Sequence, residues 1–150
     1  MHDIRTETEI RATPERIWSI LVDFPAHSAW NPFVRSIEGV LKVGGKLTVS
    51  VQPEGAKGMT FRPTVLVAIP NQELRWLGRL LLPGIFDGEH YFQIKPAQPG
   101  SSLFIHGETF SGALVPFFKS ALDTRTKAGF LAMNRALKER AEGLPAQANA

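Results

Sequence analysis

The sequence predicts an α+β domain in which a curved, seven-stranded antiparallel sheet wraps around a long C-terminal helix. Three observations lead to this fold class. The first segment alternates apolar and charged residues, as a half-buried strand does. Residues 34–112 then carry strand and turn signals only. From about residue 114 to residue 142, the apolar residues recur at helical spacing.

Length and composition fit one globular domain over residues 1–142. The chain has 150 residues, of which 43% are hydrophobic and 21% charged. Residues 143–150 are of low complexity, and we expect a disordered tail there. No apolar run approaches the roughly 20 residues that cross a bilayer, and the N-terminus has no hydrophobic signal region. We therefore expect a cytoplasmic protein without stable membrane insertion.

The charges and the absence of cysteine exclude several classes of protein. The net charge is +3, from 17 basic and 14 acidic residues, and no block of five or more like charges occurs. A nucleic-acid-binding arm is therefore not predicted. Without cysteine the chain has neither a disulfide framework nor thiolate chemistry.

The N-terminal third is predicted to contain a strand and one or two short helices. Residues 2–11 alternate between an apolar and a charged row. Thr13 is a good N-cap, Pro14 suits the first helical position, and Glu15 suits the positive end of the helix dipole. A second short helix is expected within 24–33, which two prolines interrupt.

Six further strands are predicted by alternation between turn sequences such as GG, PEG, PN, PG and QPG. The expected strands are 34–40, 46–53, 59–69, 73–81, 86–95 and 102–110. A long helix over 114–142 follows them. Because the helices are separated from the run of strands, a hollow between the sheet and the last helix is expected.

The strand over 86–95 carries a histidine in its apolar row. The residues at its even positions are Phe86, Gly88, His90, Phe92 and Ile94. Its odd positions form a row suited to water. A titratable ring on the buried face needs a polar partner, because burying it alone costs free energy.

Pairing of neighbouring hairpins provides that partner. The predicted register is defined by two opposed pairs, Leu80 with Phe86 and Ile94 with Phe104. His90 then faces Trp76 on one neighbouring strand and Glu108 on the other. His106 lies diagonal to His90. A slip of one residue in either hairpin would separate these groups.

Three roles for the His90–Glu108 pair are open. The two residues satisfy each other as a polar pair in the core, they form the polar patch of an apolar ligand pocket, or they transfer protons. A metal site formed by His90, His106 and Glu108 is not predicted. Two of these residues share one strand at a spacing of two, and no helical motif such as H-E-x-x-H occurs.

Four loose motifs occur in an order that is familiar from one superfamily. They are W-N-P-F at 30–33, L-R-W at 74–76, G-x-H-x-F at 88–92 and H-x-E-x-F-S-G at 106–112. Together they resemble the SRPBCC superfamily, the START-related helix-grip proteins, and within it the polyketide cyclase/dehydrase-like branch. The resemblance covers about residues 3–140. It implies a helix-grip fold around a deep apolar cavity that binds lipids, sterols, polyketides or other hydrophobic molecules, and no cofactor is expected.

The function predicted from this resemblance is binding of a small hydrophobic or aromatic, lipid- or polyketide-like molecule in the cavity. The residues expected to contact the ligand are Trp30, Trp76, His90, Phe92, His106, Glu108, Phe110, Phe118, Leu122 and Arg125. The alternative is a cofactor-free enzyme of the polyketide cyclase/dehydratase type, with His90 and Glu108 as its catalytic residues. A homodimeric interaction protein with a filled core is a third hypothesis.

Overall fold

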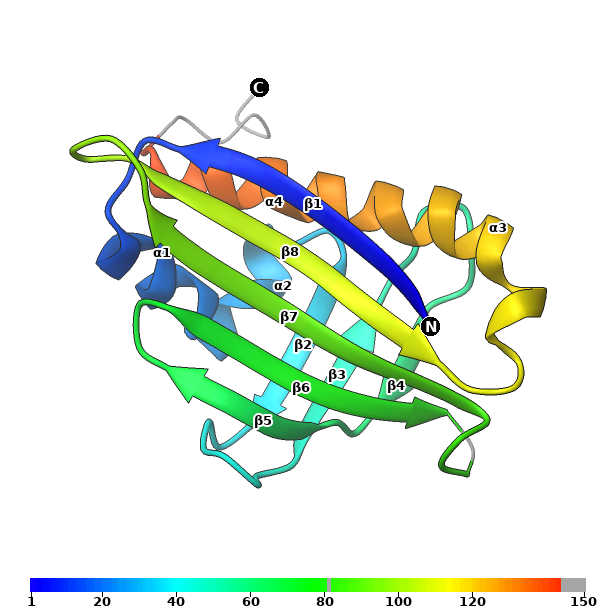
Figure 1. Cartoon of the computed structure of the whole chain (residues 1–150). Helices are drawn as coiled ribbons and strands as arrows, with labels where there is room; N and C mark the ends of the chain where they lie inside the picture. The colour runs from blue at the N-terminus through cyan, green and yellow to red at the C-terminus, as the bar shows by residue number, and fades with distance from the viewer. Residues whose placement is uncertain (81, 144–150) are drawn as a thin grey trace.

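A strongly curved antiparallel sheet, a smaller sheet that crosses it, and a C-terminal helix make up the fold (Figure 1). The computed structural model describes residues 1–80 and 82–143. The tail predicted to be disordered lies outside the described residues except for Gly143, and so does Leu81, the predicted end of one strand. The predicted α+β class with a long C-terminal helix is confirmed.

The strands are β1 (His2–Ile10), β2 (Val34–Gly39), β3 (Leu47–Val51), β4 (Met59–Phe61), β5 (Thr64–Ile69), β6 (Glu73–Leu80), β7 (Phe86–Pro96) and β8 (Ser102–Ser111). The helical segments are α1 (Pro14–Leu21), the 3-10 turn η1 (Phe24–Ala26), α2 (His27–Trp30), the 3-10 turn η2 (Val115–Phe117), α3 (Lys119–Ala121), the π-helical turn η3 (Leu122–Thr126) and α4 (Lys127–Ala141). The Thr13 side chain caps α1 by accepting a hydrogen bond from the Arg16 N–H at 3.2 Å.

The described strands form two sheets, so the predicted single sheet of seven strands is wrong. One sheet has the order β1-β8-β7-β6-β5 and the other the order β2-β3-β4. The predicted strand 59–69 is divided at Pro63, which has no N–H to contribute to a ladder. β4 ends before this proline, and β5 begins after it in the other sheet. An isolated bridge between Lys46 and Thr64 links the two sheets.

The predicted register of the two central hairpins is confirmed. Leu80 pairs with Phe86 between β6 and β7, and Ile94 pairs with Phe104 between β7 and β8. His90 therefore stands between its two predicted partners on the neighbouring strands, as the alternation indicated. The register shifts occur in other ladders, between β2 and β3 and between β5 and β6.

The C-terminal helix is shorter than predicted. A single helix over 114–142 was expected, but the regular helix α4 covers only Lys127–Ala141. Pro116 lacks a donor and occupies the first turn of η2, so a 3-10 turn replaces the expected helix there. The π-helical turn η3 then joins α3 to α4, and such turns often occur at functional sites.

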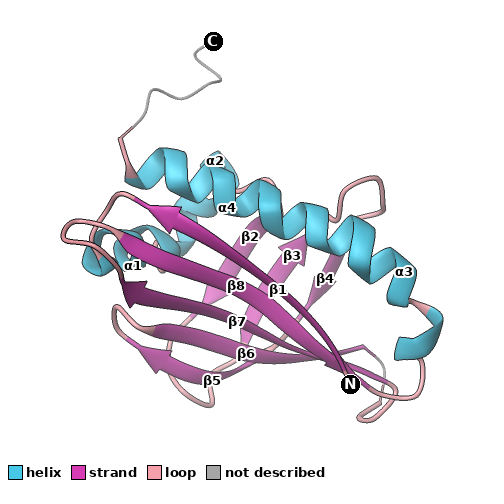
Figure 2. Cartoon of the chain, turned by 45° about the horizontal axis from the view of Figure 1, so that its top comes forward, coloured by secondary structure: helices cyan, strands magenta, loops and turns pink. Residues whose placement is uncertain are grey.

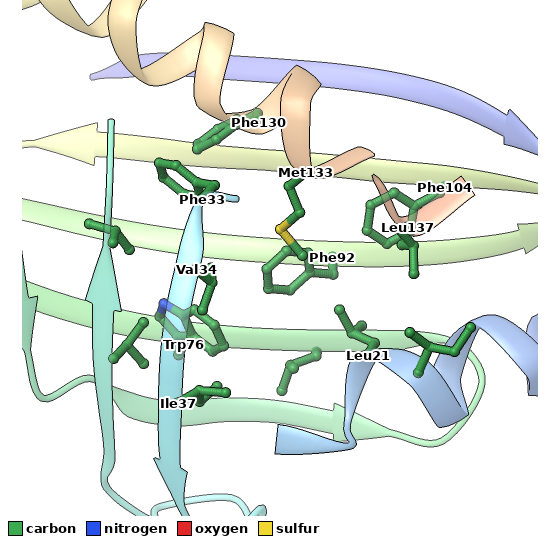
Figure 3. Packing of buried hydrophobic residues seen from close by; sticks show 14 of the residues in the cluster. Leu21, Phe33, Val34, Ile37, Trp76, Phe92, Phe104, Phe130, Met133 and Leu137 are labelled. Atoms are coloured by element: carbon green, nitrogen blue, oxygen red, sulfur yellow. The ribbon is translucent and has the colours of Figure 1, made fainter. Parts of the chain in front are cut away.

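The core lies between the larger sheet, the small sheet and α4. Figure 3 shows Phe33 and β2 residues facing Trp76 on β6 and Phe92 on β7, with Phe130 and Met133 of α4 beside them. Figures 1 and 2 show α4 running along β1 and β8. Within the described parts of the chain, no helix is long and apolar enough to cross a membrane.

A glycine allows α4 to approach the start of β2 closely. A Cβ atom built on Gly129 would overlap the ring of Phe33, and the nearest ring atoms belong to its Cδ1–Cε1 edge. Phe33 also lies edge-on to Phe130 with ring centroids 5.3 Å apart. Gly129 thus makes room for an aromatic side chain that packs against α4.

We expect Gly129→Ala to lower the free energy of unfolding by about 1–3 kcal/mol, because the added methyl overpacks the contact with Phe33. Helix propensity alone would favour alanine by about 1 kcal/mol. Urea denaturation measures the change. In a Phe33→Leu background the smaller side chain leaves room, so the same substitution should cost less. A Gly129→Ala protein more stable than wild type would contradict this packing.

Candidate functional site

A pocket of about 260 Å³ lies between the larger sheet, the edge of the small sheet and the segment that precedes α4. Its lining residues are Phe33, Val51, Pro53, Met59, Phe61, Gly78, Arg79, Leu80, Phe86, Gly88, His90, Glu108, Phe110, Leu114, Phe118, Ala121, Leu122 and Thr126. Met59, Leu80 and Phe118 are 45%, 44% and 47% exposed, so the pocket reaches the surface between them. Its wall is apolar apart from a few side chains.

Five of the ten residues predicted to contact a ligand line this pocket. They are His90, Glu108, Phe110, Phe118 and Leu122. The lining residues that were not predicted include Phe33, Phe61 of β4, Phe86 of β7, and Gly78, Arg79 and Leu80 of β6. Phe86 and Gly88 share the alternating row of His90, so the sequence contained a signal for these two. Phe33 belongs to the W-N-P-F motif, but nothing in the sequence indicated which side chains it faces.

The other five predicted contacts do not line the pocket. Trp76, Phe92 and His106 are buried beside His90 and support it from the core. Trp30 packs on His27 with ring centroids 5.0 Å apart. Arg125 is exposed. Trp76, Phe92 and His106 thus lie in the core beside His90, Trp30 and Arg125 are not among the lining residues, and ligand contact at these five positions stays a prediction.

His90 and Glu108 form the polar end of the pocket. His90 Nδ1 lies 3.1 Å from Glu108 Oε1, and the two side chains are only 4% and 14% exposed. The His90 ring is nearly parallel to that of Trp76, at a centroid distance of 5.3 Å, and to that of Phe33, at 6.3 Å. Aromatic neighbours therefore fix the plane of the imidazole and direct its Nδ1 atom at the carboxyl group.

The absence of a side chain at Gly88 leaves room for the carboxyl group of Glu108. A Cβ atom on Gly88 would collide with Glu108 Oε2, so any larger residue would push the carboxyl group aside. Gly88 precedes His90 by two residues on the same face of β7. The G-x-H spacing thus leaves a space in which the neighbouring strand's carboxyl group meets the imidazole.

A chain of hydrogen bonds continues from His90 through the core. His90 Nε2 lies 2.8 Å from His106 Nε2, and His106 Nδ1 lies 2.9 Å from Asn134 Oδ1. Asn134 Nδ2 donates to Thr6 Oγ1 at 2.8 Å, and Thr6 Oγ1 donates to the His106 carbonyl oxygen at 2.8 Å. The four residues are buried and come from β7, β8, α4 and β1. We call Thr6, Asn134, His106 and His90 the buried relay.

The end of the buried relay determines the direction of each of its hydrogen bonds. A carbonyl oxygen can only accept, so the Thr6 hydroxyl must donate to it and accept from the Asn134 amide nitrogen. The Asn134 amide oxygen therefore faces His106 Nδ1, which must carry a proton. Neutral His106 then has a bare Nε2, which accepts a proton donated by His90 Nε2.

His106 is neutral because of where it lies. Burial in the core holds its pKa well below the ordinary value of 6.5, and the nearby His90 adds to this lowering. The hydrogen bond from Nδ1 to Asn134 acts in the opposite direction but is the smallest of the three effects.

His90 and Glu108 must consequently hold one proton between them. His90 Nε2 already carries a proton that it donates to His106, so neutral His90 would have a bare Nδ1. A bare nitrogen facing an ionised carboxylate oxygen at 3.1 Å would place two lone pairs in contact. The pair is thus either imidazolium with carboxylate or imidazole with carboxylic acid. Both forms have zero net charge.

A second buried histidine holds the start of β2 in place. His27 Nε2 donates to the Leu21 carbonyl oxygen at 2.7 Å, and its Nδ1 lies 3.1 Å from Asn31 Nδ2. Asn31 Oδ1 accepts from the backbone N–H groups of Phe33 and Val34, each at 2.9 Å. The Asn of the W-N-P-F motif thereby positions Phe33 in the pocket wall. Burial lowers the His27 pKa from 6.5.

We expect His27 to make folding weaker in acid. Because its folded pKa is lowered, the unfolded chain binds more protons as soon as the pH falls below about 6.5, and the free energy of unfolding declines from there. His27→Gln keeps a donor for Leu21 and an acceptor for Asn31 without this titration. Between pH 7 and pH 5 its free energy of unfolding should decline less steeply than that of wild type, by up to about 1.4 kcal/mol per pH unit. Equal slopes in urea denaturation would refute the assignment.

The fold and the pocket define a START-like protein with an apolar pocket and one polar pair. The chain belongs to the family described as polyketide cyclase / dehydrase and lipid transport, whose model matches residues 1–142. The resemblance stated from the four sequence motifs is thereby confirmed. No curated protein matches the chain in sequence.

Solved structures with the same fold have low sequence identity to this chain. A START superfamily protein from Mycobacterium smegmatis has a TM-score of 0.76 at 22% identity, covering 97% of this chain and 100% of the other. A protein from Thermus thermophilus has a TM-score of 0.74 at 17% identity, covering 95% and 98%. The Zhui aromatase/cyclase from Streptomyces sp. R1128 has a TM-score of 0.75 at 12% identity, covering 94% and 93%. These likenesses establish the fold.

Proposed function

We propose that this chain binds a small hydrophobic or aromatic molecule in the pocket between its two sheets. The observation that carries the proposal is an apolar pocket of about 260 Å³ with one imidazole–carboxyl pair at its buried end. Ligand pockets are typically apolar with a few placed polar groups, and their volumes run from roughly 300 to 1,000 Å³. A volume just below this range favours a ligand of one or two fused rings.

The wall of the pocket supplies the binding free energy in this proposal. The rings of Phe61 in the small sheet, Phe86 and Phe110 in the larger sheet, and Phe33 just before β2 surround the space. Each 100 Å² of apolar surface removed from water contributes about 2.5 kcal/mol before the costs of association. The His90–Glu108 pair, which has zero net charge, then forms a hydrogen bond with one polar group of the ligand. The family to which the chain belongs includes lipid transport in its description, in agreement with this function.

Filling the pocket should weaken binding. Ala121 lines the pocket, whereas its exposed neighbour Ser120 does not. We expect Ala121→Trp to weaken the binding of 2-naphthol by about tenfold or more, since losing about 60 Å² of buried apolar contact costs about 1.5 kcal/mol. Ser120→Trp is the matched control and should bind like wild type. Titration calorimetry measures both. Equal weakening by the two variants, or by neither, would speak against this pocket.

One observation favours a second function, a cofactor-free enzyme of the cyclase/dehydratase type. His90 and Glu108 share a proton inside an apolar pocket, which suits an acid–base pair acting on a carbon next to a carbonyl group. The aromatase/cyclase with the same fold agrees with this alternative. In such a reaction the pair would take a proton from the substrate carbon and later return one to carbon or oxygen.

Proton exchange separates the enzyme from the binder without knowledge of the natural substrate. For the enzyme, wild type in D₂O should accelerate deuterium incorporation next to the carbonyl group of 2-tetralone by about 10²-fold or more, followed by proton NMR. His90→Ala and Glu108→Gln should lose the acceleration. Glu89→Gln, on the other face of β7, is the matched control and should retain it. Exchange at the buffer rate in wild type would leave binding as the function.

A further inference from the structure

The two oxygens of Glu108 are in different surroundings. Oε1 faces His90 Nδ1 at 3.1 Å. Oε2 lies over Gly88, where a side chain would collide with it, and both Gly88 and Glu108 line the pocket. Among the residues that the structure describes, no side chain or backbone group donates a hydrogen bond to Oε2. A ligand in the pocket is therefore the partner that this oxygen can take.

Oε2 is a hydrogen-bond acceptor in both forms of the pair. When His90 is imidazolium, Glu108 is a carboxylate and Oε2 carries negative charge. When His90 is neutral, the acid proton lies between Oε1 and Nδ1, and Oε2 is the carbonyl oxygen of a carboxylic acid. The shared proton can move between Glu108 Oε1 and His90 Nδ1 without creating a hydrogen-bond donor that faces the pocket. The buried end of the pocket thus presents an acceptor only.

We infer that the ligand is a neutral apolar molecule with a hydroxyl group, a phenol or an alcohol, which donates a hydrogen bond to Glu108 Oε2. This inference rests on the proposed binding function and names its ligand class. A carbonyl, ether or carboxylate group would meet Oε2 with a second acceptor and leave this oxygen without a donor. A cation is disfavoured because the pair has no net charge and the wall is apolar.

Thr6 and Asn134 act as positioning residues in this scheme, although neither lines the pocket. They fix the proton of His106 on Nδ1, which obliges His90 to donate through Nε2 and to turn Nδ1 toward Glu108 as one partner of the shared proton. An amide in place of Glu108 would have to donate its NH₂ to the bare Nδ1 of His90. Its oxygen would then face the pocket, so the acceptor would be preserved.

Two probes of similar shape test the ligand class. 2-Naphthol can donate a hydrogen bond, whereas 2-methoxynaphthalene can only accept one. The measured quantity is the ratio of their dissociation constants, ether over phenol, by titration calorimetry at pH 7. We expect this ratio to fall by about tenfold or more in Glu108→Leu relative to wild type, the loss of one hydrogen bond to a charged or shared-proton group. In Glu108→Gln the preference for the phenol should persist, with a smaller ratio.

The outcomes distinguish the inference from the proposed function. If both probes bind wild type and the ratio is the same in Glu108→Leu, the inference is overturned while the binding function stands. If Glu108→Gln prefers the ether, its amide nitrogen faces the pocket. The buried relay then does not determine which atom at position 108 is presented to the ligand. If neither probe binds wild type, the proposed function fails and takes the inference with it.

The proton positions can be observed in wild type without any substitution. Long-range ¹H–¹⁵N correlation spectra distinguish the two tautomers of a histidine. We expect His106 protonated at Nδ1 only and His90 protonated at Nε2. Asn134→Leu removes the acceptor at Nδ1 and should shift the His106 proton to Nε2, a change that a purely structural role of Asn134 would not produce. A wild-type His106 protonated at Nε2 would overturn the assigned direction of the buried relay, and with it the positioning role of Thr6 and Asn134.

Discussion

The hydrogen bond from the Thr6 hydroxyl to the His106 carbonyl oxygen determines the chemistry of the whole site. A carbonyl oxygen has no proton to give, so this single bond sets the orientation of the Asn134 amide and the tautomers of both histidines. It also joins β1 to β8, while Asn134 ties both strands to α4. His90, which opens onto the pocket, is therefore oriented from the opposite side of the core, through groups that do not line the pocket.

The apolar packing has a complementary role, since it gives these polar groups fixed planes. His106 stacks on Phe130 with centroids 4.2 Å apart, and His90 lies nearly parallel to Trp76 at 5.3 Å. Two glycines make this arrangement possible, Gly129 for the ring of Phe33 and Gly88 for the carboxyl group of Glu108. Buried polar networks stabilise a unique core only when every member is satisfied, and in the buried relay each histidine nitrogen has a partner.

Alternation combined with the hairpin register predicted the centre of the larger sheet, and a slip of one residue in either hairpin would have separated His90 from its partners. The meeting of His90 with Glu108 and Trp76 followed from that register. The sequence did not indicate Asn134, whose place among the apolar residues of a helix looks like an ordinary interruption. Arg125 was predicted to contact the ligand from its position near the apolar stripe of a regular helix. It lies instead in the π-helical turn η3, where α-helical spacing does not specify which residues face the pocket. The division of the sheets depended on Pro63, which was included in a strand despite its missing donor.

The wall that η2, α3 and η3 form has a consequence for how such a pocket diversifies. The stretch from η2 to η3 meets the pocket through Phe118, Ala121 and Leu122, whereas α4 is held by Gly129 and by Asn134 of the buried relay. Insertions, deletions and exchanges of side-chain size in the short segments can therefore alter the shape of the space without moving α4. Under the proposed function, the shape of the molecule that fits and the polar group that is recognised are encoded in separate parts of the chain, so each can change in evolution while the other is retained.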